Sequence, residues 1–113
     1  VGSVDAIYVP TDSTVVSALA SVVEIGQENS LPVFSGDTDS VGRGAIASIG
    51  FNYYDIGVQT AEMVVKVLRG ARPGDLPVEF ANVLRLDINP AAAESMGVTL
   101  PESVIERADE TVQ

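Results

Sequence analysis

The sequence has 113 residues, a formal net charge of −10 and no Cys or His, and its length suits one compact domain but not two. The missing Cys and His exclude disulfides, zinc hydrolase sites and nucleophilic catalysis by Ser-His-Asp or Cys-His systems. The negative charge opposes binding to nucleic acid or to an anionic membrane, so neither is an expected partner.

The first half of the chain alternates between predicted strands and a predicted helix. Residues 4–9 are a β-prone run, and from residue 15 the apolar positions recur at helical spacing, in a helix expected to end between residues 26 and 29. Residues 31–35 form a second apolar run, so the order strand, helix, strand favours a right-handed parallel crossover. The polar residues 38–44 indicate a loop, and residues 45–50 resume as a third strand.

The longest predicted helix begins at residues 53–55 and ends at Arg69, with Gly70 just beyond it. Two apolar stripes run along this helix, so we expect it to be buried over much of its girth. Residues 71–81 contain Pro and Gly and predict an extended surface connection.

The last third of the chain predicts one strand and two short helices. Residues 83–88 alternate between apolar and polar side chains, which predicts a half-exposed strand near a sheet edge. Asn89 is the expected cap of a short helix that ends at Gly97, and residues 102–109 predict a last helix before a frayed tail. The expected fold class is therefore α/β, a mostly parallel sheet flanked by helices.

Four segments together carry a family resemblance. They are DAIYVPTDST at 5–14, LPVFSGD at 31–37, GAIASIGFNYYDIG at 44–57 and NPAAAESMG at 89–97. In this order and spacing they resemble the C-terminal portion of the ABC-transporter substrate-binding family that includes tryptophan- and tyrosine-binding proteins. The resemblance implies a type I periplasmic-binding fold, in which two α/β lobes close over a ligand.

On that template the chain is expected to be a single fragment of a solute-binding protein. Residues 1–44 would complete one lobe, residues 45–82 would supply a crossover and a helix of the other lobe, and residues 83–113 would form the terminal strand and helices. An N-terminal half would be missing. The expected macromolecular partners are therefore that missing half, or a second copy of the chain, and the membrane permease of an ABC importer.

The function implied by the resemblance is capture of a small amino-acid-like ligand outside the cytoplasm, in the periplasm or at the cell surface, without enzymatic chemistry, cofactor or metal. An alternative is the ligand-sensing domain of a LacI-like transcription regulator, which shares the fold but needs a basic DNA-binding headpiece upstream. A third reading, a flavodoxin-like enzyme or phosphoacceptor, is disfavoured because Lys66 falls in mid-helix, away from any acidic cluster.

The candidate ligand-binding residues follow three predicted strands, because the carboxyl ends of parallel strands open onto a common space. They are Thr11, Asp12, Asp37, Phe51, Asn52 and Tyr53. The resemblance points first to Asp37, whose carboxylate would pair with a ligand ammonium. The alternative for Asp37 is a loop residue that bonds its own backbone.

The other candidates also have structural alternatives. Thr11 would bond a carboxylate or hydroxyl of the ligand. The structural alternative for Asp12 is to cap the following helix, and the alternative for Asn52 is to form a turn. The rings of Phe51 and Tyr53 suit stacking on an aromatic ligand or packing between lobes. Tyr54 is assigned to packing, and Arg43 is either a partner for a ligand carboxylate or a solvated loop residue.

Overall fold

The computed structural model describes residues 2–112 and divides the chain into two compact units. The first, which we call the sheet unit, comprises Val1–Gly50 and Arg85–Gln113. The second, the helical unit, is the intervening segment Phe51–Leu84. The chain thus leaves the sheet unit once and returns to it once.

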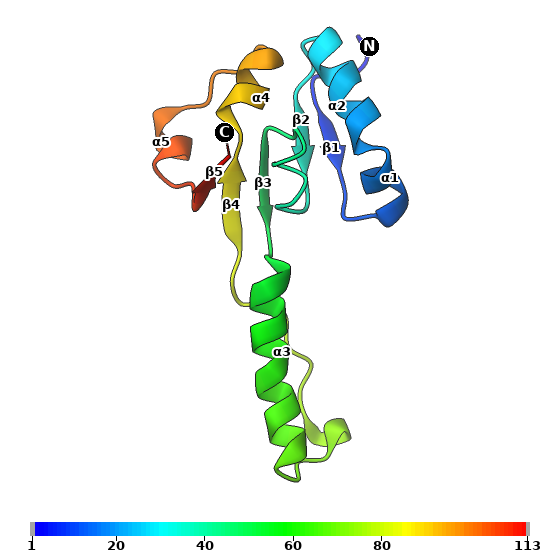
Figure 1. The fold of residues 1–113 in the computed structure, drawn as a ribbon, viewed down its shortest axis with the longest axis vertical. Helices are drawn as coiled ribbons and strands as arrows, with labels where there is room; N and C mark the ends of the chain where they lie inside the picture. Colours follow the sequence, from blue (N-terminus) through cyan, green and yellow to red (C-terminus); the bar gives the residue numbers. More distant parts are fainter. Residues whose placement is uncertain (1, 113) are drawn as a thin grey trace. The chain divides into compact units, whose positions relative to one another are not determined.

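The sheet unit contains one five-stranded sheet, and its strands lie in chain order from β1 to β5 (Figure 1). The strands are β1 (Ile7–Val9), β2 (Val33–Ser35), β3 (Ala47–Gly50), β4 (Arg85–Ile88) and β5 (Glu110–Thr111). The β1–β2, β2–β3 and β4–β5 pairs are parallel, and only β3 and β4 are antiparallel. The predicted fold class, α/β with a mostly parallel sheet, is confirmed.

Two helices connect β1 to β2 where the sequence predicted one. They are α1 (Ser13–Ser17) and α2 (Leu19–Glu28), and they meet at Ala18. Asp12 caps α1, since its Oδ1 accepts hydrogen bonds from the amides of Thr14 and Val15 at 2.9 and 3.0 Å. The break is supported from a distant loop, where Arg43 Nη2 donates to the Val16 carbonyl at 3.0 Å. No local sequence signal reports that contact.

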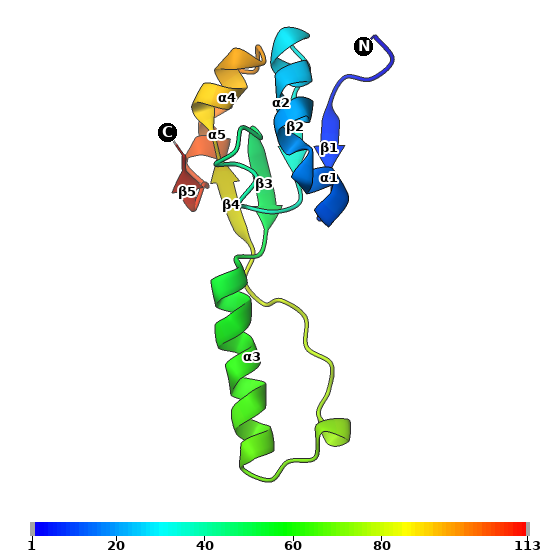
Figure 2. The same ribbon diagram turned by 45° about the vertical axis from the view of Figure 1, so that its right-hand side comes forward.

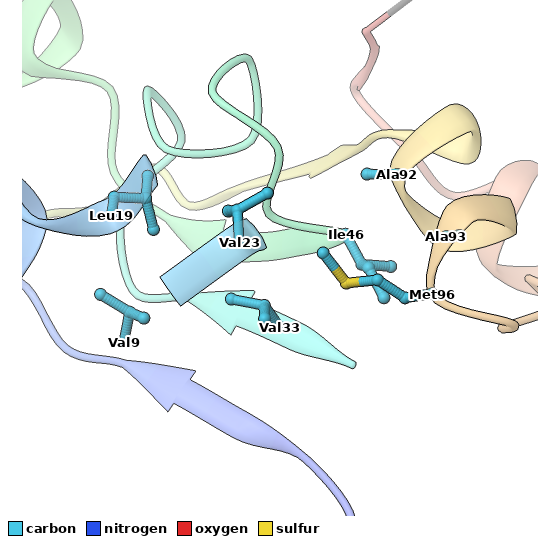
Figure 3. Packing of buried hydrophobic residues seen from close by; sticks show 8 residues of the cluster. All are labelled: Val9, Leu19, Val23, Val33, Ile46, Ala92, Ala93 and Met96. Atoms are coloured by element: carbon cyan, nitrogen blue, oxygen red, sulfur yellow. The ribbon is translucent and has the colours of Figure 1, made fainter. Parts of the chain in front are cut away.

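The core of the sheet unit lies on one face of the sheet, between the strands and the helices α2 and α4 (Pro90–Ser95). Figure 3 shows its eight buried side chains: Val9, Leu19, Val23, Val33, Ile46, Ala92, Ala93 and Met96. Met96 bridges the two helices, because a methyl group at Gly26 of α2 would lie 3.4 Å from its Cε. Burial of these aliphatic groups is the main force that holds the unit together.

The C-terminal part of the sheet differs from the prediction. Residues 83–88 were expected to form a half-exposed strand near an edge, and residues 102–109 a helix before a frayed tail. Instead α5 spans only Glu102–Ile105, and the tail returns as β5 beside β4. The amides of Asp109 and Val112 donate to the Leu86 and Ile88 carbonyls, both at 2.8 Å. β4 is therefore an interior strand, and Ile88 is fully buried.

The helical unit consists of α3 (Tyr53–Leu68), a 3-10 turn η1 (Pro73–Asp75) and an extended return, visible in Figure 2. Gln59 of α3 holds the return through its Nε2, which donates to the Phe80 carbonyl at 2.8 Å, and its Oε1, which accepts from the Asn82 amide at 3.3 Å. The expectation that this helix is buried over much of its girth is wrong within its own unit, since none of its residues is buried. Among residues 2–112 no helix is long and apolar enough to cross a bilayer.

Candidate functional site

The carboxyl ends of β1, β2 and β3 meet at one edge of the sheet unit. Thr11, just after β1, donates its Oγ1 hydrogen to the Gly36 carbonyl at 3.3 Å. At the end of β3, a methyl group on Gly50 would lie 2.9 Å from the Gly36 oxygen and 3.5 Å from the Cα of Asp37. Thr11 and Asp37 are therefore neighbours at this edge, as the sequence predicted.

Asp37 is buried, with only 6% of its surface exposed, and its carboxylate is engaged within its own loop. Oδ1 accepts from the Ser40 amide at 2.9 Å, and Oδ2 accepts from the Ser40 hydroxyl at 2.8 Å. Ser35 adds a hydrogen bond from its hydroxyl to the Asp37 carbonyl at 3.0 Å. This is the loop role that the sequence left open as the alternative for Asp37. The remaining lone pairs of the carboxylate are free to accept hydrogen bonds from a ligand.

Phe51, Asn52 and Tyr53 belong to the helical unit, so their convergence with Thr11 and Asp37 stays a prediction. Asn52 caps α3, because its Oδ1 accepts from the Tyr54 amide at 2.8 Å. The rings of Phe51 and Tyr53 meet edge to face, with centroids 5.4 Å apart. Tyr53 is 58% exposed and could stack on a further aromatic group.

Two buried polar atoms in the sheet escaped the sequence reasoning. Ser48 and Asp87 face each other across β3 and β4, and Ser48 Oγ and Asp87 Oδ1 have no hydrogen-bond partner among the described residues. Burial raises the pKa of the Asp87 carboxyl, while the Arg85 guanidinium, 3.9 Å away, acts in the opposite direction. Alternation along β4 placed Asp87 on the face opposite Leu86, but it did not indicate that Asp87 is buried.

Within residues 2–112 no group of three acidic side chains is placed to hold a metal ion. The polar groups at the strand ends are hydroxyls, one carboxylate and backbone carbonyls, a set suited to hydrogen bonds with a small polar molecule.

The family model described as ABC transporter substrate binding protein matches residues 1–112. The chain belongs to this family. A tyrosine-binding protein of Clostridioides difficile strain R20291 is 36% identical over 89 residues, which cover 79% of this chain and 26% of that protein.

Solved structures of similar proteins agree with this fold. A conserved domain protein from Vibrio cholerae O1 biovar El Tor is 48% identical, with a TM-score of 0.85 over 95% of this chain and 36% of its own. An ABC domain from Streptococcus pneumoniae, solved in complex with L-Trp, is 38% identical, with a TM-score of 0.85 over 97% of this chain and 37% of its own. This member of the substrate-binding family thus spans little more than a third of the length of these structures.

Proposed function

We propose that this chain is part of the solute-binding component of an ABC importer, which captures an aromatic amino acid or a similar small solute in a cleft between two lobes and delivers it to a membrane permease. The protein works outside the cytoplasm and does no chemistry on its ligand. The observation that carries the proposal is the meeting of Thr11 and Asp37 at the carboxyl edge of a sheet in a substrate-binding family member. The named ligands of two relatives, tyrosine and L-Trp, support the ligand class.

In this proposal the two units contribute to different lobes, and a further α/β segment, absent from these 113 residues, supplies the rest of the cleft. The solved relatives support it, because they carry more than half of their length outside the match. Asp37 takes the ligand ammonium with its free lone pairs, and Thr11 also contacts the ligand. Phe51, Asn52 and Tyr53 of the helical unit are further ligand contacts in this proposal.

The test is titration calorimetry on the protein at its full natural length, with tryptophan, tyrosine, phenylalanine and simple sugars as ligands. We expect binding of at least one aromatic amino acid and no heat from the sugars. If none of the amino acids binds, the proposed ligand class is wrong. Binding of a sugar alone would point to another branch of solute-binding proteins.

Two substitutions of Asp37 separate ligand binding from loop structure. Asp37→Asn keeps the shape and the acceptor for the Ser40 amide but removes the charge, whereas Asp37→Ala removes both. We expect both variants to lose affinity for the amino acid, with Asp39→Ala as the exposed control from the same loop. If Asp37→Asn binds as well as the wild type, the role of Asp37 is confined to the loop.

A further inference from the structure

Tyr8 has an unusual position for a residue in the middle of a strand. It lies in β1 on the face opposite the core and is 66% exposed, whereas the next residue, Val9, is 1% exposed. Its hydroxyl reaches along the strand to the carboxyl edge, where a methyl group on Gly36 would lie 2.7 Å from it. No hydrogen bond engages this hydroxyl within residues 2–112.

Gly36 brings Tyr8 and Thr11 together over one backbone position. The Thr11 Oγ1 would lie 3.0 Å from the same methyl group, so both hydroxyls occupy the space that a side chain would fill. Any larger residue at position 36 must push at least one of them away. The glycine therefore permits a pair of hydroxyls beside Asp37, at the edge where the proposed ligand is held.

The groups at this edge are mostly hydrogen-bond acceptors. Thr11 donates to the Gly36 carbonyl, which leaves its oxygen lone pairs as acceptors, and Asp37 is an acceptor by its charge. Arg43, in the loop after β2, directs its guanidinium to the Val16 carbonyl. With a net charge of −10 on the chain, this edge suits a donor and not a second anion.

We propose that Tyr8 is a further ligand-contacting residue, and that Tyr8 and Thr11 accept hydrogen bonds from the ammonium group of the bound amino acid. This rests on the proposed function and adds an orientation to it: the sheet unit holds the ammonium end, so the carboxylate end is held elsewhere. The competing role for Tyr8 is packing, since its ring also borders an apolar hollow of about 350 Å³ that Phe34, Ala47 and Ile49 line. A packing role needs the ring and not the hydroxyl.

Tyr8→Phe separates these roles because it keeps the ring and removes only the hydroxyl. The experiment is titration calorimetry on the full-length protein with whichever of tryptophan, tyrosine and phenylalanine the wild type binds most tightly, and with the analogue of that ligand that lacks the amino group. For the amino acid we expect a loss of affinity of about tenfold, the size of one hydrogen bond to a charged group. For the analogue without the amino group we expect no loss.

Thr11→Val and Tyr54→Phe complete the design. Thr11→Val should lower the affinity for the amino acid to a similar degree. In the double variant with Tyr8→Phe, the fold loss of affinity should be smaller than the product of the two single losses, because both hydroxyls contact the same ammonium group. Tyr54, which is 78% exposed at the start of α3, is the matched tyrosine, and its substitution should change nothing.

Three results would overturn the proposed role of Tyr8, and they differ in what else they overturn. Wild-type affinity in Tyr8→Phe assigns Tyr8 to packing and overturns the inference, while leaving the proposed function intact. Equal losses for the amino acid and its analogue place Tyr8 against another part of the ligand and overturn the orientation. A wild type that binds none of the amino acids overturns both proposals together.

Discussion

The two units of the chain are held together in different ways. The sheet unit has a core of eight buried aliphatic side chains and loops fixed by buried polar groups such as Asp37 and Asn89. The helical unit has no buried residue, and its return segment is held to α3 chiefly by the half-buried Gln59 and the exposed Lys66. A hollow of about 560 Å³ lies between α3 and residues 73–79, lined mostly by apolar groups.

This contrast teaches that an apolar pattern predicts burial but not the partner that provides it. The stripes of α3 are those of a packed helix, yet Leu68 is 80% exposed and Val64 is 49% exposed. The sheet unit buries much of its apolar pattern within the chain, although Ile49 is 63% exposed, and the helical unit buries none of it. The exposed apolar surface of α3 is accordingly the feature of the described residues that calls for a covering partner.

The largest expected effect compares one leucine from each unit. Leu19 of α2 is fully buried, so Leu19→Ala should lower the free energy of unfolding of the 113-residue chain by about 2–5 kcal/mol through lost transfer energy and a cavity. Leu68→Ala removes an exposed side chain at the end of α3, so it should change the free energy of unfolding by less than about 0.5 kcal/mol. Urea unfolding followed by circular dichroism measures both. Equal losses would mean that the Leu68 face is covered, which would remove the contrast between the units.

The next effect compares two asparagine caps. Asn89 is buried; its Oδ1 accepts from the Ala92 amide at 2.9 Å and its Nδ2 donates to the Val41 carbonyl at 3.0 Å. Asn89→Ala leaves both partners unsatisfied and should destabilise the chain by about 2–3 kcal/mol. Asn52→Ala removes a single capping hydrogen bond from α3, and this bond is exposed. The substitution should lower the free energy of unfolding by about 1 kcal/mol or less. Similar values for the two would show that burial does not strengthen the Asn89 network.

The sequence predicted those helix ends that are fixed by contacts between neighbouring residues. Asp12 and Asn89 cap helices as expected, and Gly70 takes a positive φ of 104° just beyond α3. Strand β5 was not predicted, because Glu110 and Thr111 pair with residues more than twenty positions away and carry no strand pattern of their own. The break at Ala18 was missed for the same reason, since Arg43 supports it from a distant loop.

The candidate site was likewise predicted only in part. Strand-end logic placed Thr11 beside Asp37, because it needs only the order of parallel strands. It did not identify Ser40 as the partner of the Asp37 carboxylate, although an Asp followed three residues later by Ser is a pattern of such turns. Nor did it identify Tyr8, whose reach to Gly36 depends on a side-chain direction that alternation alone does not give. Sequence thus predicts which backbone ends meet better than which side chains occupy the space between them.

A smaller effect tests how the helical unit holds its return segment. Gln59→Ala removes the hydrogen bonds to the Phe80 carbonyl and from the Asn82 amide, all in exposed positions. We expect the free energy of global unfolding to fall by less than about 1 kcal/mol, because hydrogen bonds to water replace the lost ones. Hydrogen exchange at residues 79–82 should nevertheless become faster, since this segment opens locally. Gln27→Ala, which removes an exposed bond to Ser95 in the sheet unit, is the control and should leave that exchange unchanged.

The smallest effect concerns Asp87, where burial in the sheet unit has an unfavourable side. Desolvation raises the pKa of its carboxyl above the ordinary value, and Arg85 offsets part of the rise. Because the folded state then binds the proton more tightly than the unfolded state, stability from this group is present at low pH and is lost as the pH rises from the ordinary pKa through the raised one. Asp87→Asn carries no charge at any pH, so it should be more stable than the wild type above this window and equal to it below.

Urea unfolding of both proteins across the acidic range measures that difference, and the comparison cancels the titration of the other carboxylates. Ser48→Ala is the matched control, since it removes the other unpartnered buried oxygen of the same strand pair without removing a titrating group. Its effect on stability should be the same at every pH. If the advantage of Asp87→Asn likewise fails to grow as the pH rises, the attraction of Arg85 balances desolvation in full, and burial in the sheet unit carries no electrostatic penalty at this position.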